Sequence, residues 1–233
     1  MKFWDRAWSL VKGCTPVSEG CDNCWLRAMD KRFGKAWSGD VLFREELLDL
    51  PLRTRKPTVW AIWSDLYHPA VTQQQLEAVI DTTWHAPEHT FLVVTKRPER
   101  AAQNTVLWPD NVYHLITVET QSRADKRIPY ALQILSKVGL LIEPMLGPVD
   151  ISDTYWYVDA FSEKPRHRSE IYFVIVGGET GPKARPLHPD WVRSVRDQCA
   201  QAGVPFYLKH LNKKAGRILD GRTHDELPWR ENE

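Results

Sequence analysis

Three cysteines near the start of the chain are the residues best suited to chemistry. Cys14, Cys21 and Cys24 fall within eleven residues, whereas the fourth cysteine, Cys199, lies far along the chain. Clustered thiolates are preferred ligands of iron–sulfur clusters, zinc and copper(I). A closed structural zinc site takes four ligands, usually as two pairs. This segment has one Cys-x-x-Cys pair and one further thiol, which favours a metal or cluster with one open position.

The backbone that carries these cysteines is predicted to be a loop. Gly13, Pro16 and Gly20 interrupt the segment, and these residue types favour turns and tight backbone paths. Such a loop can wrap a cluster with its amides directed at sulfur. Two other interpretations of the thiols stay open, a disulfide and a structural zinc site that a histidine completes.

The composition indicates an ordinary soluble globular protein. The chain has 233 residues, 42% hydrophobic and 26% charged, which suits one domain with one sizeable core. A net charge of +1 argues against a strongly basic nucleic-acid binder, although it allows a local basic groove. Residues 1–8 lack the apolar stretch of a secretory signal, and no apolar run is long enough to span a membrane. We therefore expect a cytoplasmic protein, in which thiols stay reduced.

Apolar runs and amphipathic stretches alternate from residue 58 onward. Before that point, we expect a helix over 25–33, with Leu26, Met29 and Phe33 on one face, and an irregular segment over 35–57. The basic residues of that segment, Arg53, Arg55 and Lys56, are interpreted as a solvated surface. Strands are expected at 58–63, 90–94, 112–118, 138–142, 171–176 and 204–208, with a weaker one just before Cys14; helices are expected at 73–85, from Pro98, at 123–136 and at 189–202.

This alternation predicts parallel strands joined by crossover helices. We expect a single α/β domain over 1–233, built as a partial or full (β/α) barrel, with an open doubly wound sheet as the alternative. Within it, residues 1–34 form the cysteine loop and the first helix, and residues 148–169 form an insertion. The polar tail over 213–233 is expected to cover an edge of the sheet or to be partly loose.

Polar and charged residues follow the predicted strands one after another. In both architectures ligands bind beyond the carboxyl ends of the strands, so such residues are expected to converge. The set consists of Ser64, Asp65, Thr95, Lys96, Arg97, Glu119, Glu143, Gly177, Gly178, Glu179, Lys209 and His210. Any one of them could be a helix cap or a solvated charge, but together they predict a pocket.

The residue types in this set suggest roles. The pair Gly177 and Gly178 allows a ligand to approach the backbone closely, and Glu179 can accept hydrogen bonds from an ammonium or from hydroxyls. Lys96 and Arg97 suit a carboxylate or a phosphate. The remaining candidates are interpreted as structural or exposed: Cys199, on the apolar stripe of its helix, and His68, His85, His89 and His114, which lack paired spacing.

Six motifs together resemble a known family. They are Gly13-Cys-x6-Cys-x2-Cys-Trp25, Ser64-Asp-Leu-Tyr-His68, Thr95-Lys-Arg-Pro98, Glu143-Pro-Met-Leu-Gly-Pro148, Val176-Gly-Gly-Glu-Thr-Gly181 and His188-Pro-Asp-Trp191. The family is common in phages and bacteria and is catalogued as a domain of unknown function with a three-cysteine motif. The resemblance covers nearly the whole chain.

The chain also resembles the wider class of radical S-adenosylmethionine (SAM) enzymes. This resemblance implies a partial (β/α) barrel in which Cys14, Cys21 and Cys24 hold a [4Fe–4S] cluster. SAM would chelate the open iron, and reductive cleavage with an external electron donor would give a 5′-deoxyadenosyl radical. The SAM-binding residues would then be Ser64, Asp65, Thr95, Arg97, Gly177, Gly178 and Glu179, and the catalytic ones Glu119, Glu143, Lys96 and Lys209.

The motif departs from the common radical SAM pattern in two ways. Six residues rather than three separate Cys14 from Cys21, and the aromatic Trp25 follows the last cysteine instead of preceding it. The Gly-Gly-Glu sequence, which usually follows the second strand, here follows the strand at 171–176. Either this sequence or the pair Ser64–Asp65 would therefore contact SAM.

The phage setting implied by the resemblance suggests a modified nucleotide or DNA base as the substrate, as in phage DNA hypermodification. Basic clusters at 164–168 and 209–217, with tryptophan and tyrosine for stacking, agree with this substrate class, and a peptide or small molecule is the alternative. Two other functions stay open. One is a zinc-stabilised module that binds nucleic acid or protein; the other is a metal-independent barrel enzyme with Glu119, Glu143 or Glu179 as general acid–base and Lys96 or Lys209 as its partner.

Overall fold

A seven-stranded parallel sheet forms the centre of the computed structural model, which describes residues 2–32, 39–152, 170–211 and 216–230. The strand order is β1-β4-β5-β6-β7-β8-β9, with every neighbouring pair parallel. The strands are β1 Arg6–Ala7, β4 Val59–Ile62, β5 Thr90–Thr95, β6 Val112–Thr117, β7 Lys137–Ile142, β8 Ile171–Gly177 and β9 Phe206–His210.

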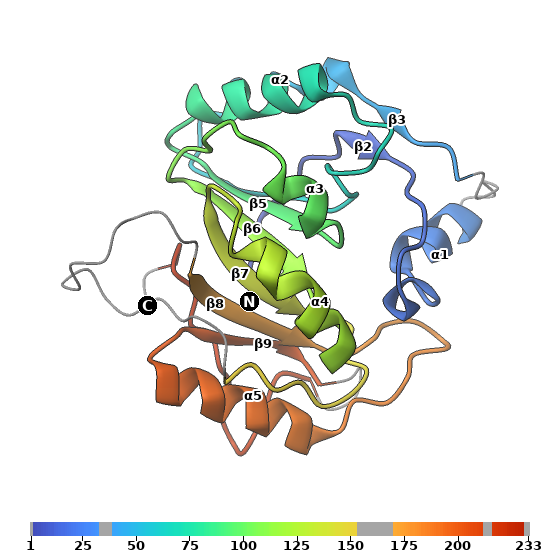
Figure 1. Cartoon of the computed structure of the whole chain (residues 1–233), viewed down its shortest axis with the longest axis vertical. Helices are drawn as coiled ribbons and strands as arrows, with labels where there is room; N and C mark the ends of the chain where they lie inside the picture. The colour runs from blue at the N-terminus through green and yellow to red at the C-terminus, as the bar shows by residue number, and fades with distance from the viewer. Residues whose placement is uncertain (1, 33–38, 153–169, 212–215, 231–233) are drawn as a thin grey trace.

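The strands follow one another across the sheet in chain order, and β1 and β9 form its two edges. A doubly wound sheet would reverse its strand order part-way across, so the alternative architecture is wrong. The sheet is an open half-barrel, which confirms the prediction of a partial (β/α) barrel. Its outer helices are α2 Gln73–Trp84, α3 Pro98–Ala102, α4 Gln121–Ala131 and α5 Pro189–Ala202, whereas α1 Trp25–Arg32 stands apart from them with the cysteine loop (Figure 1).

Both faces of the sheet are apolar, and alternate residues of a strand belong to different cores. In β5, Phe91 and Val93 pack with the outer helices, whereas Leu92 and Val94 belong to the cluster on the inner face. The indole of Trp229, from near the C-terminus, packs 4.9 Å from the ring of Phe173 on that inner face. The C-terminal segment thus packs on the inner face near the start of β8.

Local signals explain most of the helix boundaries. Thr72 and Gln75 form a reciprocal capping box at the start of α2, and Gly203, with a φ of 68°, ends α5. The helix predicted over 123–136 is shorter than expected, because α4 ends at Ala131, soon after Pro129. Leu135, within the predicted range, lies beyond this end and is 43% exposed.

The N-terminal third is more ordered than the sequence indicates. β1 joins the edge of the main sheet, and β2 Val11–Lys12 pairs antiparallel with β3 Leu42–Phe43. The segment predicted as irregular over 35–57 therefore contains a short strand, and a 3₁₀ helix follows it at Glu45–Leu47. In α1, Met29 is 44% exposed, so the predicted apolar face is wrong for this residue, and Phe33 lies outside the described residues.

Two further predictions concern the second half of the chain. Most of the expected insertion, including its basic cluster, lies outside the described residues. In the tail, residues 216–230 run beside β9, where the amide of Leu208 donates to the carbonyl of His224 at 2.9 Å. Lys209 and His210 belong to β9 itself rather than to the loop after it. None of the described helices is long and apolar enough to cross a membrane.

Candidate active site at the carboxyl ends of the strands

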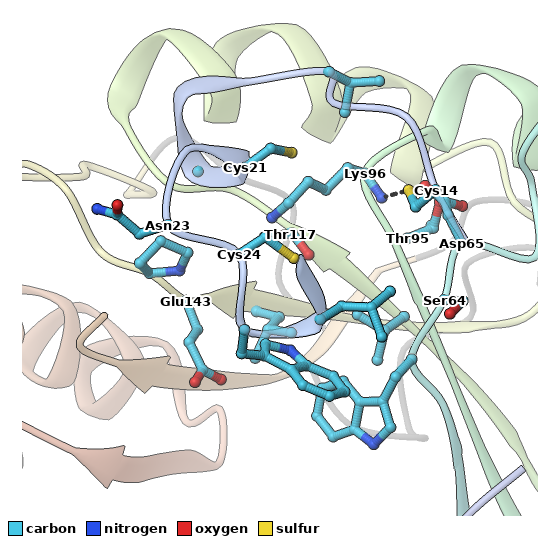
Figure 2. A pocket seen from close by; sticks show the side chains of 18 of the residues that line it. Cys14, Cys21, Asn23, Cys24, Ser64, Asp65, Thr95, Lys96, Thr117 and Glu143 are labelled. Carbon is cyan, nitrogen blue, oxygen red and sulfur yellow. Dashed lines mark hydrogen bonds between the residues drawn. The ribbon is translucent and has the colours of Figure 1, made fainter. Parts of the chain in front are cut away.

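One pocket of about 940 Å³, its open mouth included, lies between the cysteine loop and the strand ends. Figure 2 shows the three thiols on one side of it and the strand-end residues around them. Most residues of the predicted set line it: Cys14, Cys21, Cys24, Ser64, Asp65, Thr95, Lys96, Arg97, Glu143, Gly178, Glu179 and Lys209. Glu119 does not line the pocket, and its carboxylate contacts Ser18 of the cysteine loop.

Asp65 follows β4 and holds the first part of the cysteine loop in place through hydrogen bonds of Arg97. Arg97 Nη1 donates to Asp65 Oδ2 at 2.7 Å, and Nη2 donates to the carbonyl of Thr15 at 2.9 Å. Thr95 Oγ1 donates to the other carboxylate oxygen at 2.6 Å. The same guanidinium lies 3.8 Å from the sulfur of Cys14. Burial, and next the charge of Asp65, raise the pKa of the Cys14 thiol, although Arg97 opposes them.

Glu119, after β6, fastens the middle of the loop. Its carboxylate is fully buried and accepts from Ser18 Oγ at 2.6 Å. Arg127 lies 2.6 Å from one carboxylate oxygen and Lys96 2.8 Å from the other. Burial raises the pKa of Glu119, but the two positive charges outweigh it, so the pKa is lowered overall. A Cβ on Gly20 would lie 2.4 Å from Glu119 Oε1, so only glycine fits here without a shift.

Glu179, after β8, fastens the last part of the loop. It accepts from Asn23 Nδ2 at 2.9 Å and from Arg185 Nη2 at 2.5 Å. Arg185 also donates to the carbonyl of Glu19 at 2.9 Å. Burial acts to raise the pKa of Glu179, and the bonds from Arg185 lower it overall. The glutamate of the Gly-Gly-Glu sequence therefore binds the loop between two cysteines.

A fourth carboxylate, Glu143, has different partners. Lys209 Nζ lies 2.6 Å from its Oε1 and also 5.5 Å from the centre of the Trp63 ring. Among the described residues, no hydrogen bond or ion pair joins Glu143 or Lys209 to the cysteine loop. Figure 2 shows Glu143 on the side of the pocket away from Cys14 and Asp65. Burial acts to raise the pKa of Glu143, but Lys209, together with His210 at 3.8 Å, lowers it overall.

The candidate donor set consists of three thiols at one pocket. All four cysteines are free thiols, so the disulfide alternative is not formed. Within the described ranges, no three His, Cys, Asp or Glu side chains are grouped closely enough to hold one ion. An iron–sulfur cluster spreads its thiolate ligands around several irons, and three thiols around one pocket suit that arrangement.

Several residues of the site escaped the sequence analysis. Ser18, Asn23 and Arg185 bind the carboxylates or the loop, yet nothing in their local sequence indicates a partner. Arg127 did carry a signal, because a charged residue lies in the buried stripe of α4 between Ala124 and Ile128. The structure agrees with the interpretation of the other candidates as structural or exposed: Cys199, His68, His89 and His114 are buried, and His85 is exposed.

Comparisons with known proteins identify the family of this chain and its likeness of fold. A model of the family described as "Protein of unknown function (DUF5131)" matches residues 1–228. The chain belongs to this family. The resemblance to a domain of unknown function is thereby confirmed. No curated protein matches the sequence.

Two solved structures of spore photoproduct lyase, a radical SAM enzyme, share the fold of this DUF5131 protein. A mutant with bound AdoMet and dinucleoside spore photoproduct aligns with a TM-score of 0.56 at 12% identity. A second mutant also gives 0.56, at 11% identity. Each alignment covers 88% of this chain and 76% of the other. Identity this low shows likeness of fold alone, and that fold is the half-barrel of radical SAM lyases.

Proposed function

We propose that this DUF5131 protein is a radical SAM-type enzyme with a [4Fe–4S] cluster on Cys14, Cys21 and Cys24. One observation carries the proposal. The three thiols line a single pocket at the carboxyl ends of parallel strands, and three strand-end carboxylates fasten the loop that bears them. Free thiols on a surface would need no such fastening. A cluster on these thiols, together with SAM and an external electron donor, would supply the electron for reductive cleavage of SAM.

The residues around this site have different proposed roles. Asp65, Glu119 and Glu179 act as positioning residues, because their bonds hold the cysteine loop. The guanidinium of Arg97, 3.8 Å from the sulfur of Cys14, tunes that ligand, since hydrogen bonds to sulfur affect cluster potentials. Apolar side chains such as Val94 and Leu141 line the pocket and exclude water from it.

Of the four predicted catalytic residues, we retain the pair Glu143 and Lys209. Four residues were candidates, and two of them, Glu119 and Lys96, are engaged with each other below the cysteine loop. Glu143 and Lys209 also pair with each other, but both of them line the pocket, whereas Glu119 does not. We assign the acid–base and electrostatic roles to this pair, which can hold or move a proton at a bound substrate.

The substrate class that we propose is a nucleotide or a base in DNA, consistent with a role in phage DNA modification. One structural neighbour contains both AdoMet and a dinucleoside spore photoproduct, which supports a nucleotide substrate bound beside SAM. The tryptophans that line the pocket suit stacking against a planar base. The external electron donor is an additional partner in this scheme.

Anaerobic purification and cluster reconstitution test the proposal. Iron and zinc are quantified, and EPR spectra of the reduced protein are recorded with and without SAM. We expect a [4Fe–4S] signal that shifts on addition of SAM and is lost in Cys21→Ala. Cys199→Ala, which removes a buried thiol outside the pocket, is the matched control and should keep the signal.

Two results would overturn the proposal. One is a single zinc per chain without iron, which would favour the binding module. The other is a cluster whose EPR signal does not respond to SAM. Activity on a nucleic-acid substrate that survives replacement of all three loop cysteines would instead favour the metal-independent barrel enzyme.

A further inference from the structure

The four strand-end carboxylates of the site fall into two groups. Asp65, Glu119 and Glu179 bind the cysteine loop directly or through an arginine. Glu143 binds Lys209 instead, and that ion pair lines the pocket. The loop-binding carboxylates come from the ends of β4, β6 and β8, whereas Glu143 and Lys209 come from β7 and β9. The loop therefore does not occupy this pair, which remains available to a ligand.

Two tryptophans lie at the same pocket. Trp63 follows β4 on the inner face of the sheet, and its indole packs edge to face on Phe3 and Trp4 at 5.8 and 5.5 Å. Trp25, directly after Cys24, meets Trp63 edge to face at 6.2 Å. Although Trp25 lines the pocket, it is 43% exposed. A large indole left uncovered in a pocket provides a surface on which a flat ring can stack.

The charge of the pair restricts the ligand. Glu143 and Lys209 are 2.6 Å apart and sum to zero charge, so they do not favour a phosphate or an isolated ammonium. They do offer one acceptor and one donor side by side. A nucleobase is a neutral flat ring whose edge carries N–H donors beside carbonyl or ring-nitrogen acceptors. Its edge can bond both members of the pair while its face stacks on an indole.

We propose that Trp25, Trp63, Glu143 and Lys209 form a nucleobase subsite. The biological role of this subsite rests on the proposed function, because the base would lie beside Cys24, a proposed cluster ligand. Trp25 supplies the stacking face. The ring of Trp63 lies 5.5 Å from the Lys209 ammonium and holds it in position. The carboxylate of Glu143 accepts from an N–H of the base, and Lys209 donates to the adjacent acceptor. The base can belong to a nucleic-acid substrate or to the adenine of SAM.

Calorimetric titration of the full chain with dinucleotides tests the subsite. Thymidylyl-thymidine, its guanosine, cytidine and adenosine counterparts and a dinucleotide without bases are the probes. Base-containing probes should bind, and the abasic one should not. Trp25→Ala should weaken binding by roughly tenfold or more, given the usual contribution of one stacked base. Trp25→Phe should keep most of the affinity. Trp84→Ala, which removes an exposed tryptophan of α2, should change nothing.

The double variant Glu143→Gln/Lys209→Met removes both charges together, so neither is left buried and unpaired. It should weaken base binding severalfold and alter the preference among the four bases. Titration of the same variants with SAM, in cluster-loaded protein, separates the two sources. A loss confined to dinucleotides assigns the subsite to the substrate, and a loss confined to SAM assigns it to the cofactor's adenine.

Three results would overturn the subsite: equal binding of abasic and base-containing probes, equal effects of Trp25→Ala and Trp84→Ala, or no binding of dinucleotide or SAM at millimolar concentration. Iron is measured in every sample. Wild-type protein without a cluster would refute the proposed function, yet its dinucleotide titration would still report on the subsite. The two failures are therefore distinguishable.

Discussion

The hydroxyl of Ser18 donates a hydrogen bond of 2.6 Å to Oε1 of Glu119. Ser18 precedes Cys21 by three residues, and Glu119 lies just beyond the end of β6. Arg127 and Lys96 bind the same carboxylate. The position of Cys21 is therefore coupled to a buried ion cluster that belongs to the sheet and its helices.

Replacing Ser18 with alanine removes this link and leaves the ion cluster in place. A hydrogen bond to a charged group contributes about 1.5–3 kcal/mol, so we expect a loss of unfolding free energy at the lower end of that range. We also expect less iron retained after reconstitution and a shifted EPR signal. Ser194→Ala, in α5 and away from the pocket, is the control. Wild-type iron content and spectra in Ser18→Ala would contradict the coupling.

Glu119→Gln should be far more damaging. The substitution removes the charge that neutralises Arg127 and Lys96, and Arg127 is only 2% exposed. Breaking one side of a buried ion pair typically costs about 3–5 kcal/mol. Urea denaturation at neutral pH measures the change, with Glu77→Gln on the exposed surface of α2 as the reference. An unfolding free energy within about 0.5 kcal/mol of wild type would show that the buried charges are compensated elsewhere.

Gly20 and Gly147 form a matched pair for testing the packing of the loop. A Cβ on Gly20 would meet Glu119 Oε1 at 2.4 Å, whereas one on Gly147 would meet nothing within 4 Å. Overpacking of this kind costs about 1–3 kcal/mol. We expect Gly20→Ala to lower the melting temperature and the cluster content, and Gly147→Ala to leave both unchanged. Equal behaviour of the two variants would mean that the loop can move away from β6 without cost.

His114 predicts how stability depends on pH. Its ring is fully buried beside Tyr67, whose hydroxyl lies 2.7 Å from Nε2, and burial lowers its pKa to about 3. Between the unfolded value near 6.5 and this folded value, the unfolded chain binds the extra proton, so stability falls as pH falls. His114 alone should remove about 1–2 kcal/mol between pH 6.5 and pH 5.

Urea denaturation of wild type and His114→Gln between pH 7 and pH 4.5 measures this contribution. The variant is expected to be less stable at pH 7, because the fit to Tyr67 is lost, but its stability should decline less steeply as the pH falls. His85→Gln, at an exposed position, should follow the wild-type curve. Parallel curves for wild type and His114→Gln would show that the ring is protonated in the folded protein.

The sequence by itself determined the architecture of the chain. Apolar runs with residues of both faces buried, as in β5, and amphipathic helices with caps, as in α2, are local patterns. They identified six of the seven strands of the sheet. The helices between these strands indicated that neighbouring strands run parallel. The same reasoning located Cys14 and Cys24 on a loop and most strand-end residues at one pocket, but Cys21 lies in the short 3₁₀ helix Glu19–Cys21 and not in a loop.

Only the tertiary structure decided what each strand-end residue binds. Ser18 and Glu119 are 101 residues apart, and Asn23 and Glu179 are 156 apart. A sequence specifies the type of a side chain. Whether two side chains form an ion pair or a hydrogen bond depends on the distance between their elements to within a few tenths of an ångström. Those separations arise when helices and loops pack on the sheet, and this packing directs three carboxylates to the cysteine loop and leaves Glu143 facing the pocket.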